Sequence, residues 1–153
     1  MIQKFQIIER ASELTSGALL VLSEMDQNHF PTPWSKEDWD HVLSAGQRLL
    51  ISVEENKIIL GFALFDVVSA DSFAHLFKIV VTPDVRGKGI GKNLLIEALK
   101  VLKERDIKKI FLEVEEYNTH AIRLYESLGF KIIHKKKHFY SSGATALIMT
   151  LDV

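Results

Sequence analysis

The stretch Arg-Gly-Lys-Gly-Ile-Gly-Lys, residues 86–92, is the most informative part of the chain. It follows an apolar run that ends at Val81, and from Ile90 onward apolar residues recur at helical spacing. Three glycines at the start of a helix are unfavourable unless the backbone must come close to a ligand. The free N–H groups of a helix N-terminus, beside basic side chains, favour a phosphate group. We therefore expect phosphate binding here; a plain glycine-rich helix cap is the alternative.

Two common phosphate-binding loops do not fit these residues. A Walker A loop would need glycine in place of Arg86 and serine or threonine in place of Asn93. The dinucleotide-binding fingerprint would need glycine in place of Lys92, and the runs before it have the pattern of antiparallel strands. The sequence excludes both.

The composition is that of an ordinary globular protein. The chain has 153 residues, of which 47% are hydrophobic and 25% charged, so it fits neither a disordered nor a membrane protein. We expect a single domain over residues 1–153. The formal net charge of −1 gives no sign of a nucleic-acid partner or a membrane surface.

Cysteine is absent from the chain, which excludes a disulfide framework, a thiolate metal site and a cysteine nucleophile. The histidines lack metal-ligand spacing, so we expect no metal. The N-terminus does not resemble a secretion signal, and no apolar run reaches the roughly 18 residues of a membrane span. These features predict a cytoplasmic protein.

Residue patterns predict a strand over residues 4–9 and a helix that Ser12 caps. Ser35 followed by Asp38 is a variant capping box for a short helix that ends near Gly46. Three β-rich runs, residues 48–54, 57–69 and 73–82, then predict an antiparallel meander.

The second half of the chain begins with a helix from residue 90 to about residue 105. A strand over residues 110–115 follows, and then a helix with Asn118 as its N-cap and Gly129 as the left-handed residue at its end. Residues 130–137 and 144–152 are expected to form a hairpin.

Taken together, these motifs resemble the GNAT N-acetyltransferase superfamily. The pattern Arg-x-x-Gly-x-Gly from Arg86, after a strand that ends in Ile-Val-Val, is similar to the acetyl-CoA signature of that family. Leu-Glu-Val at residues 112–114, Asn118, and the run Ala-Ile-Arg-Leu-Tyr-Glu-Ser-Leu-Gly-Phe at 121–130 resemble the RimI-type N-terminal acetyltransferases. Phe-Pro-Thr-Pro-Trp-Ser at 30–35 is similar to their substrate loop, so the likeness runs from about Phe30 to the end.

The resemblance implies an α/β (α+β) fold with a mixed, mostly antiparallel seven-stranded sheet, about four flanking helices and a splay between the fourth and fifth strands. The pantetheine arm of acetyl-CoA would enter this splay, and its diphosphate would lie on the amides of residues 86–92. No metal is implied. The residues implied in binding acetyl-CoA are Ile79, Val80, Val81, Arg86, Gly87, Lys88, Gly89, Ile90, Gly91, Lys92 and Asn118.

Two residues are candidates for the proton transfers. Strand alternation places Glu113 on the face opposite its apolar neighbours, a position that also fits an ordinary solvated carboxylate. The resemblance implies that Glu113 is the general base. Tyr125 lies on the apolar face of its helix, where a tyrosine is usually a core residue. The resemblance implies that it donates a proton to the sulfur of CoA, and a phenol with a pKa near 10 is protonated at neutral pH.

The acceptor side is expected at Phe30, Pro31, Trp34 and Tyr140, which could line a peptide groove or form a small satellite core. The resemblance implies that acetyl passes directly from acetyl-CoA to the α-amine of a protein N-terminus, without an acetyl-enzyme. A ribosomal protein is among the acceptors that it implies.

Other functions and the choice of acceptor stay open at this stage. A small-molecule amine or a lysine side chain is the alternative acceptor, and a non-catalytic CoA-binding module is the alternative of another class. Phe73 and Lys78 depart from the resemblance, because many relatives have an acidic residue and an asparagine there, and both positions border the expected acceptor site. The sequence does not determine the oligomeric state.

Overall fold

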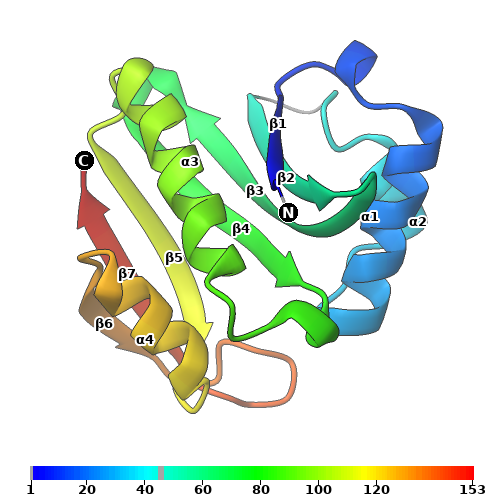
Figure 1. Cartoon of the computed structure of the whole chain (residues 1–153). Coiled ribbons are helices and arrows are strands. Elements are labelled where there is room, and N and C mark those ends of the chain that lie inside the picture. Colours follow the sequence, from blue (N-terminus) through cyan, green and yellow to red (C-terminus); the bar gives the residue numbers. More distant parts are fainter. Residues whose placement is uncertain (1, 45–46) are drawn as a thin grey trace.

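The structure is a computed structural model that describes residues 2–44 and 47–153. Its centre is a seven-stranded sheet in the order β1-β2-β3-β4-β5-β7-β6 (Figure 1). The strands are β1 (Lys4–Ile8), β2 (Arg48–Glu55), β3 (Ile58–Val68), β4 (Phe73–Val81), β5 (Lys109–Glu115), β6 (Lys131–Lys136) and β7 (Ala146–Asp152). The α-helices are α1 (Ser16–His29), α2 (Lys36–Asp40), α3 (Ile90–Glu104) and α4 (Thr119–Ser127). Short 3-10 turns occur at Ala11–Glu13, Ser69–Asp71 and Pro83–Val85.

Neighbouring strands are antiparallel except for β4 and β5, which are parallel. The predicted mixed, mostly antiparallel seven-stranded sheet with four helices is confirmed. β4 and β5 pair only at their beginnings, from Phe73 with Lys109 to His75 with Phe111. Beyond these residues the two strands separate, which is the predicted splay between the fourth and fifth strands.

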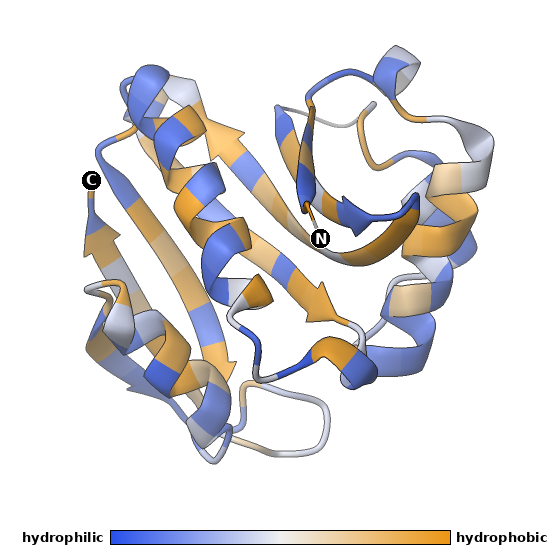
Figure 2. Ribbon diagram, viewed as in Figure 1, coloured by the Kyte–Doolittle hydropathy of each residue, from blue (hydrophilic) through white to orange (hydrophobic). Residues whose placement is uncertain are grey.

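Two apolar clusters cover the two sides of the sheet. α3 and α4 pack on one side, here called the α3 face, where Ala74, Leu76, Leu112 and Tyr125 are buried together. α1 and α2 pack on the other side, the α1 face, with Trp39 in its cluster. Every second residue of β5 is buried on the α3 face, which gives the sheet two different faces. Figure 2 shows that β5 is mostly hydrophobic, with hydrophilic residues at its start and in its second half. None of the helices in the described part of the chain has the length and hydrophobicity of a membrane-spanning segment.

A β-bulge in β4 reverses which residues of its second half point their side chains to each face of the sheet. Leu64 of β3 pairs with Lys78 whereas the next residue, Phe65, pairs with Leu76, so Phe77 is an extra residue in β4. Leu76 before the bulge and Ile79 after it both lie with the α3 cluster. Lys78 therefore turns toward the α1 face.

Local capping signals correctly predicted several element ends. Ser35 and Asp38 form the capping box, because the Ser35 hydroxyl accepts from Asp38 N at 3.1 Å and the Asp38 carboxylate accepts from Ser35 N at 3.4 Å. Asn118 caps α4 by accepting from Ala121 N at 3.2 Å. Gly129, just after α4, has the expected positive φ of 99°.

Two predicted boundaries were wrong. The cap of α1 is Thr15, whose hydroxyl accepts from Ala18 N at 3.1 Å, whereas Ser12 lies in a preceding 3-10 turn. The Glu13 carboxylate accepts from the amide of Arg10 at 3.0 Å and closes that turn, so the helix starts later. α2 ends at Asp40 and turns follow it; Gly46, near which we expected its end, lies outside the described residues.

Candidate active site

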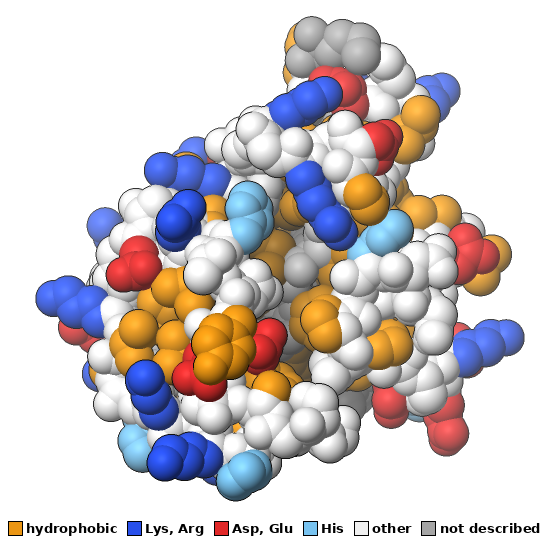
Figure 3. Space-filling model, turned by 90° about the horizontal axis from the view of Figure 1, so that it is seen from below, with side chains coloured by type: hydrophobic (Ala, Val, Ile, Leu, Met, Phe, Trp, Pro, Cys, Tyr) orange, Lys and Arg blue, Asp and Glu red, His pale blue; other side chains and the backbone are white. Residues whose placement is uncertain are grey.

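A cleft of about 1230 Å³ opens where β4 and β5 separate. Figure 3 looks at this end of the molecule and shows a hollow with basic side chains beside it. Lys88 and Trp34 are the two predicted site residues that do not line the cleft. The predicted residues that do line it are Phe30, Pro31, Ile79, Val80, Val81, Arg86, Gly87, Gly89, Ile90, Gly91, Lys92, Glu113, Asn118, Tyr125 and Tyr140.

The turn of residues 86–92 lines the cleft with every residue except Lys88 and leads into the N-terminus of α3. Gly87 and Gly89 have φ values of 79° and 80°, a left-handed conformation that is costly for other residues. Gly89 is the N-cap of α3, and none of the described side chains caps this helix. Its first N–H groups therefore have no partner within the helix. Such a turn can bind a diphosphate through its amides.

Glu113 lies on the α1 face, because Leu112 and Val114 beside it are buried in the α3 cluster. His75 Nε2 is 2.5 Å from Glu113 Oε2, a short hydrogen bond between β4 and β5. The imidazole ring stacks on Phe111 with ring centroids 4.2 Å apart, and it meets the Phe77 ring in a T-shaped arrangement with centroids 4.7 Å apart. These rings hold His75 in place, and His75 in turn orients the carboxylate.

Tyr125 reaches the cleft from α4 and is only 6% exposed. Its ring packs against Phe130 with centroids 5.8 Å apart. Burial, with a smaller effect from Tyr140, raises the pKa of the Tyr125 hydroxyl above its usual value of 10. The hydroxyl is therefore protonated at neutral pH and can act as a proton donor.

Tyr140 lines the cleft from the segment between β6 and β7. Burial, and then the negative charges of Glu113 and Glu115, raise the pKa of Tyr140 to about 12. Tyr140 therefore carries an uncharged hydroxyl near the Glu113 carboxylate. Asn118 also lines the cleft, and because capping uses only its side-chain oxygen, the side-chain nitrogen can still donate a hydrogen bond.

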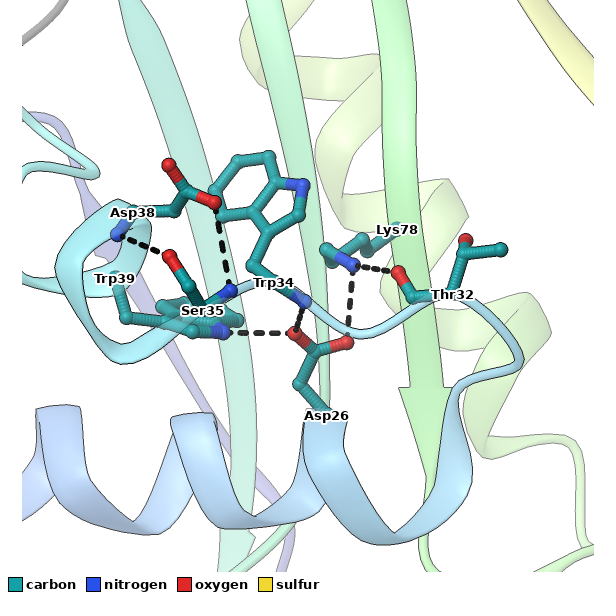
Figure 4. Close-up of polar contacts among 7 residues, drawn as sticks. All are labelled: Asp26, Thr32, Trp34, Ser35, Asp38, Trp39 and Lys78. Carbon is teal, nitrogen blue, oxygen red and sulfur yellow. Dashed lines mark hydrogen bonds and ion pairs between the residues drawn. The ribbon is translucent and has the colours of Figure 1, made fainter. Parts of the chain in front are cut away.

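The end of α1 and the segment after it form the edge of the cleft on the α1 face, through His29, Phe30, Pro31 and Thr32. Trp34 instead packs against Trp39 and Phe77, with ring centroids 5.5 Å and 6.0 Å away. An ion pair between Lys78 and Asp26, at 3.0 Å, lies beneath this segment (Figure 4). Burial lowers the pKa of Lys78 below its usual 10.5, and the hydrogen bond and charge of Asp26 offset part of this effect.

His75 and the Lys78–Asp26 pair were not found by sequence reasoning. His75 alternates with apolar residues, as a surface histidine of a strand would, and its contact with Glu113 depends on the register of β4 and β5. Lys78 was recognised only as a departure from the family pattern, and the bulge that turns it inward has no signal in the local sequence. Among the described residues, no group of three or more His, Cys, Asp or Glu could hold a metal ion.

The arrangement can support transfer of a group between two molecules. The turn of residues 86–92 lies on the α3 face and Glu113 on the α1 face, and one cleft joins them through the gap between β4 and β5. A proton acceptor and a buried proton donor line the same cleft.

Comparisons with known proteins agree with this geometry. The [ribosomal protein bS18]-alanine N-acetyltransferase of Escherichia coli (strain K12) is 32% identical over 146 residues, which are 93% of this chain and 96% of that protein. The enzyme of the same name from Haemophilus influenzae is 36% identical over 120 residues, 78% of this chain and 79% of that one. The crystal structure of the Escherichia coli ribosomal-protein-S18-alanine N-acetyltransferase matches with a TM-score of 0.83 at 29% identity, covering 98% of this chain and 94% of that one.

The same fold occurs in a more distant protein, NAA60 of Arabidopsis thaliana in complex with acetyl-CoA. Its TM-score is 0.84 at 17% identity, and the match covers 98% of this chain and 99% of that one. The model of the acetyltransferase (GNAT) family matches residues 18–130, a span that includes most of α1, the turn before α3, Glu113 and Tyr125. By this match and by its similarity to the enzymes above, the chain belongs to the acetyltransferase (GNAT) family.

Proposed function

We propose that this chain transfers the acetyl group of acetyl-CoA to the α-amine of a protein N-terminus. The observation that carries the proposal is the cleft, which connects the amide-rich turn at residues 86–92 with Glu113 through the gap between β4 and β5. The two substrates approach from opposite faces of the sheet and meet in this gap. In this proposal the acetyl group passes directly from acetyl-CoA to the amine, because one cleft holds both substrates.

Acetyl-CoA binds on the α3 face. The turn at residues 86–92 holds the diphosphate with its uncapped main-chain amides, and the basic side chains of Arg86 and Lys92 add positive charge. The backbone of residues 79–81, at the open edge of β4, lies along the pantetheine arm. This gives acetyl-CoA the role of a substrate that brings the acetyl group into the gap.

Two residues that line the cleft carry out the proton transfers at the acceptor amine and at the sulfur of CoA. Glu113 takes one proton from the ammonium group of the acceptor, and the freed nitrogen lone pair forms the new bond to the carbonyl carbon. The carbon–sulfur bond breaks, its electron pair goes to sulfur, and Tyr125 supplies the proton that makes the free thiol of CoA. The nitrogen gives up its second proton through solvent water to the tyrosinate, which restores Tyr125, and Glu113 releases its proton to solvent.

An α-amine is the acceptor that suits this site best on energetic grounds. With a pKa near 7.8, its deprotonation at pH 7 costs about 1 kcal/mol, against about 4.6 kcal/mol for a lysine near 10.4. The carboxylates of Glu113 and Glu115 line the cleft and attract an incoming ammonium group. The Escherichia coli relative acts on an alanine of ribosomal protein bS18, and an N-terminal alanine peptide of that protein is the first acceptor to test.

The test is an acceptor screen with acetyl-CoA and mass spectrometry. An Ala-starting peptide is compared with the same peptide blocked at its α-amine, with a lysine peptide, and with polyamines and aminoglycosides. We expect a gain of one acetyl group on the free N-terminus and none on the blocked peptide. Turnover only on a lysine or a non-peptide amine would refute the acceptor class, and binding of acetyl-CoA without any turnover would show a non-catalytic module.

A further inference from the structure

A buried ammonium group lies beneath the segment of residues 30–34, here called the acceptor loop. The Lys78 side chain is 2% exposed, and its Nζ donates to Asp26 Oδ1 and to the main-chain oxygen of Thr32, each at 3.0 Å (Figure 4). The same Nζ is 4.1 Å from the centroid of the Phe30 ring. The ammonium thus contacts the acceptor loop at two points.

Asp26 connects the loop to the helices. Its side chain is fully buried, and Oδ2 accepts from Trp34 N at 2.8 Å and from Trp39 Nε1 at 2.7 Å (Figure 4). One carboxylate of α1 therefore bonds to the end of the acceptor loop, to α2 and, through Lys78, to β4. Each carboxylate oxygen has a charged or strongly polar donor.

The position of Lys78 in β4 relates the loop to the reaction site. The bulge at Phe77 turns Lys78 to the α1 face, while the adjoining Ile79 faces the α3 cluster on the side where acetyl-CoA would bind. Lys78, Phe30 and Thr32 all line the cleft on the side of Glu113 from which an acceptor would enter. The ammonium of Lys78 therefore supports the acceptor loop at the side of the cleft where the acceptor would enter. It takes no part in the proton transfers.

A buried ion pair is poor evidence for stability, because desolvation of both charges offsets their attraction and a neutral replacement is often as stable. What this pair adds is geometry: an ammonium has three donors, and here it joins a carboxylate, a loop carbonyl and an aromatic face. A neutral side chain of similar length would fill the space but would hold neither Thr32 nor Phe30.

We propose that Lys78 and Asp26 are positioning residues that fix the acceptor loop in its binding conformation and so set the affinity for the acceptor. The inference rests on the proposed function, since it takes the α1 face as the acceptor's side. It predicts that loss of the pair weakens acceptor binding while acetyl-CoA binding, on the other face, stays intact.

The test variant is Asp26→Asn with Lys78→Met. The asparagine oxygen can still accept from Trp34 N and Trp39 Nε1, and methionine fills the space of the lysine, so no unpaired charge is buried. We expect KM for the acceptor peptide to rise roughly tenfold, with KM for acetyl-CoA and kcat unchanged. The matched control is Lys109→Met with Asp152→Asn, an exposed pair at 3.6 Å between β5 and β7, for which no change is expected.

A second measurement does not need activity. The chain has two tryptophans, and both Trp34 and Trp39 contact this network, so quenching of tryptophan fluorescence by acrylamide reports the exposure of the loop. We expect stronger quenching in the double variant, with an unchanged circular dichroism spectrum. The positioning role of Lys78 and Asp26 is refuted if the double variant keeps both the acceptor KM and the quenching of the unaltered protein, or if both KM values rise equally. If the unaltered protein acetylates no amine, the proposed function is refuted instead. The quenching measurement then decides whether Lys78 and Asp26 hold the acceptor loop in place.

Discussion

Among single residues, Glu113 has the most direct consequence for the rate. If it takes the proton of the acceptor amine, Glu113→Gln keeps the size of the side chain but removes the base, and kcat should fall by roughly 10² to 10⁴. Glu115 is the matched control, because it also lines the cleft but makes no contact with His75 in the described structure. Steady-state kinetics should show Glu115→Gln with a kcat close to that of the unaltered protein. Equal losses in the two variants would mean that only the negative charge of the cleft matters.

His75 acts on the same carboxylate through the 2.5 Å hydrogen bond. His75→Phe retains a ring that can stack on Phe111 but loses the bond. A hydrogen bond to a charged group is worth about 1.5–3 kcal/mol, so we expect kcat to fall roughly ten- to a hundredfold. The decisive measurement is a double-mutant cycle with Glu113→Gln. If His75 works by orienting Glu113, its replacement has no further effect once the carboxylate is gone.

Residue-scale prediction from the sequence had a clear physical limit. Alternation along one strand correctly placed Glu113 on the face opposite Leu112 and Val114. The contact with His75 joins residues 38 positions apart and depends on the pairing of two strands. Nothing in the local sequence around either residue determines that pairing.

At the scale of elements, the turn before α3 should control acetyl-CoA binding alone. Gly89→Ala places a side chain where φ is 80°, which costs about 1–2 kcal/mol unless the turn rearranges. Steric overlap with other parts of the chain does not contribute to this cost, because a Cβ at Gly89 would meet no atom within 4 Å. We expect a higher KM for acetyl-CoA, an unchanged KM for the acceptor peptide, and a smaller increase in melting temperature on addition of CoA.

Gly17 provides the matched control for this turn. It lies in α1, its φ is not positive, and an added Cβ would also meet no atom within 4 Å. Gly17→Ala should leave both KM values unchanged and should not lower the melting temperature, since alanine favours a helix. A Gly89→Ala variant that behaves like Gly17→Ala would show that the turn does not hold the nucleotide.

The ends of helices could be predicted where no other side-chain hydrogen bond competed with the capping residue. The capping box at Ser35 and Asp38 and the cap at Asn118 each involve residues three apart, and both were correctly predicted. Ser12 failed as a cap because the Glu13 carboxylate closes an earlier turn, so that Thr15 caps α1. The splay between β4 and β5 came from the family resemblance, since an apolar strand pattern does not reveal where pairing stops.

For the whole molecule, the gap between β4 and β5 exposes groups that a continuous sheet would cover, and buried polar groups gather around it. Tyr125 and Tyr140 line the cleft as uncharged phenols, and burial raises the pKa of both above the usual value of 10. Their placement makes the stability of the fold depend on pH in the alkaline range.

The sign of that dependence follows from proton binding. Above pH 10 the tyrosines of the unfolded chain lose their protons first, while Tyr140 keeps its proton until about pH 12 and Tyr125 also keeps its own. The stabilisation is complete below pH 10, and the free energy of unfolding falls as pH rises from 10 to 12. Urea unfolding at several pH values should show a flatter profile for Tyr125→Phe. Tyr117→Phe is the control, since Tyr117 is 79% exposed and its replacement should leave the slope unchanged. A Tyr125→Phe profile as steep as that of the unaltered protein would show that this hydroxyl can ionise in the folded state, and the proton donor would then have to be sought elsewhere in the cleft.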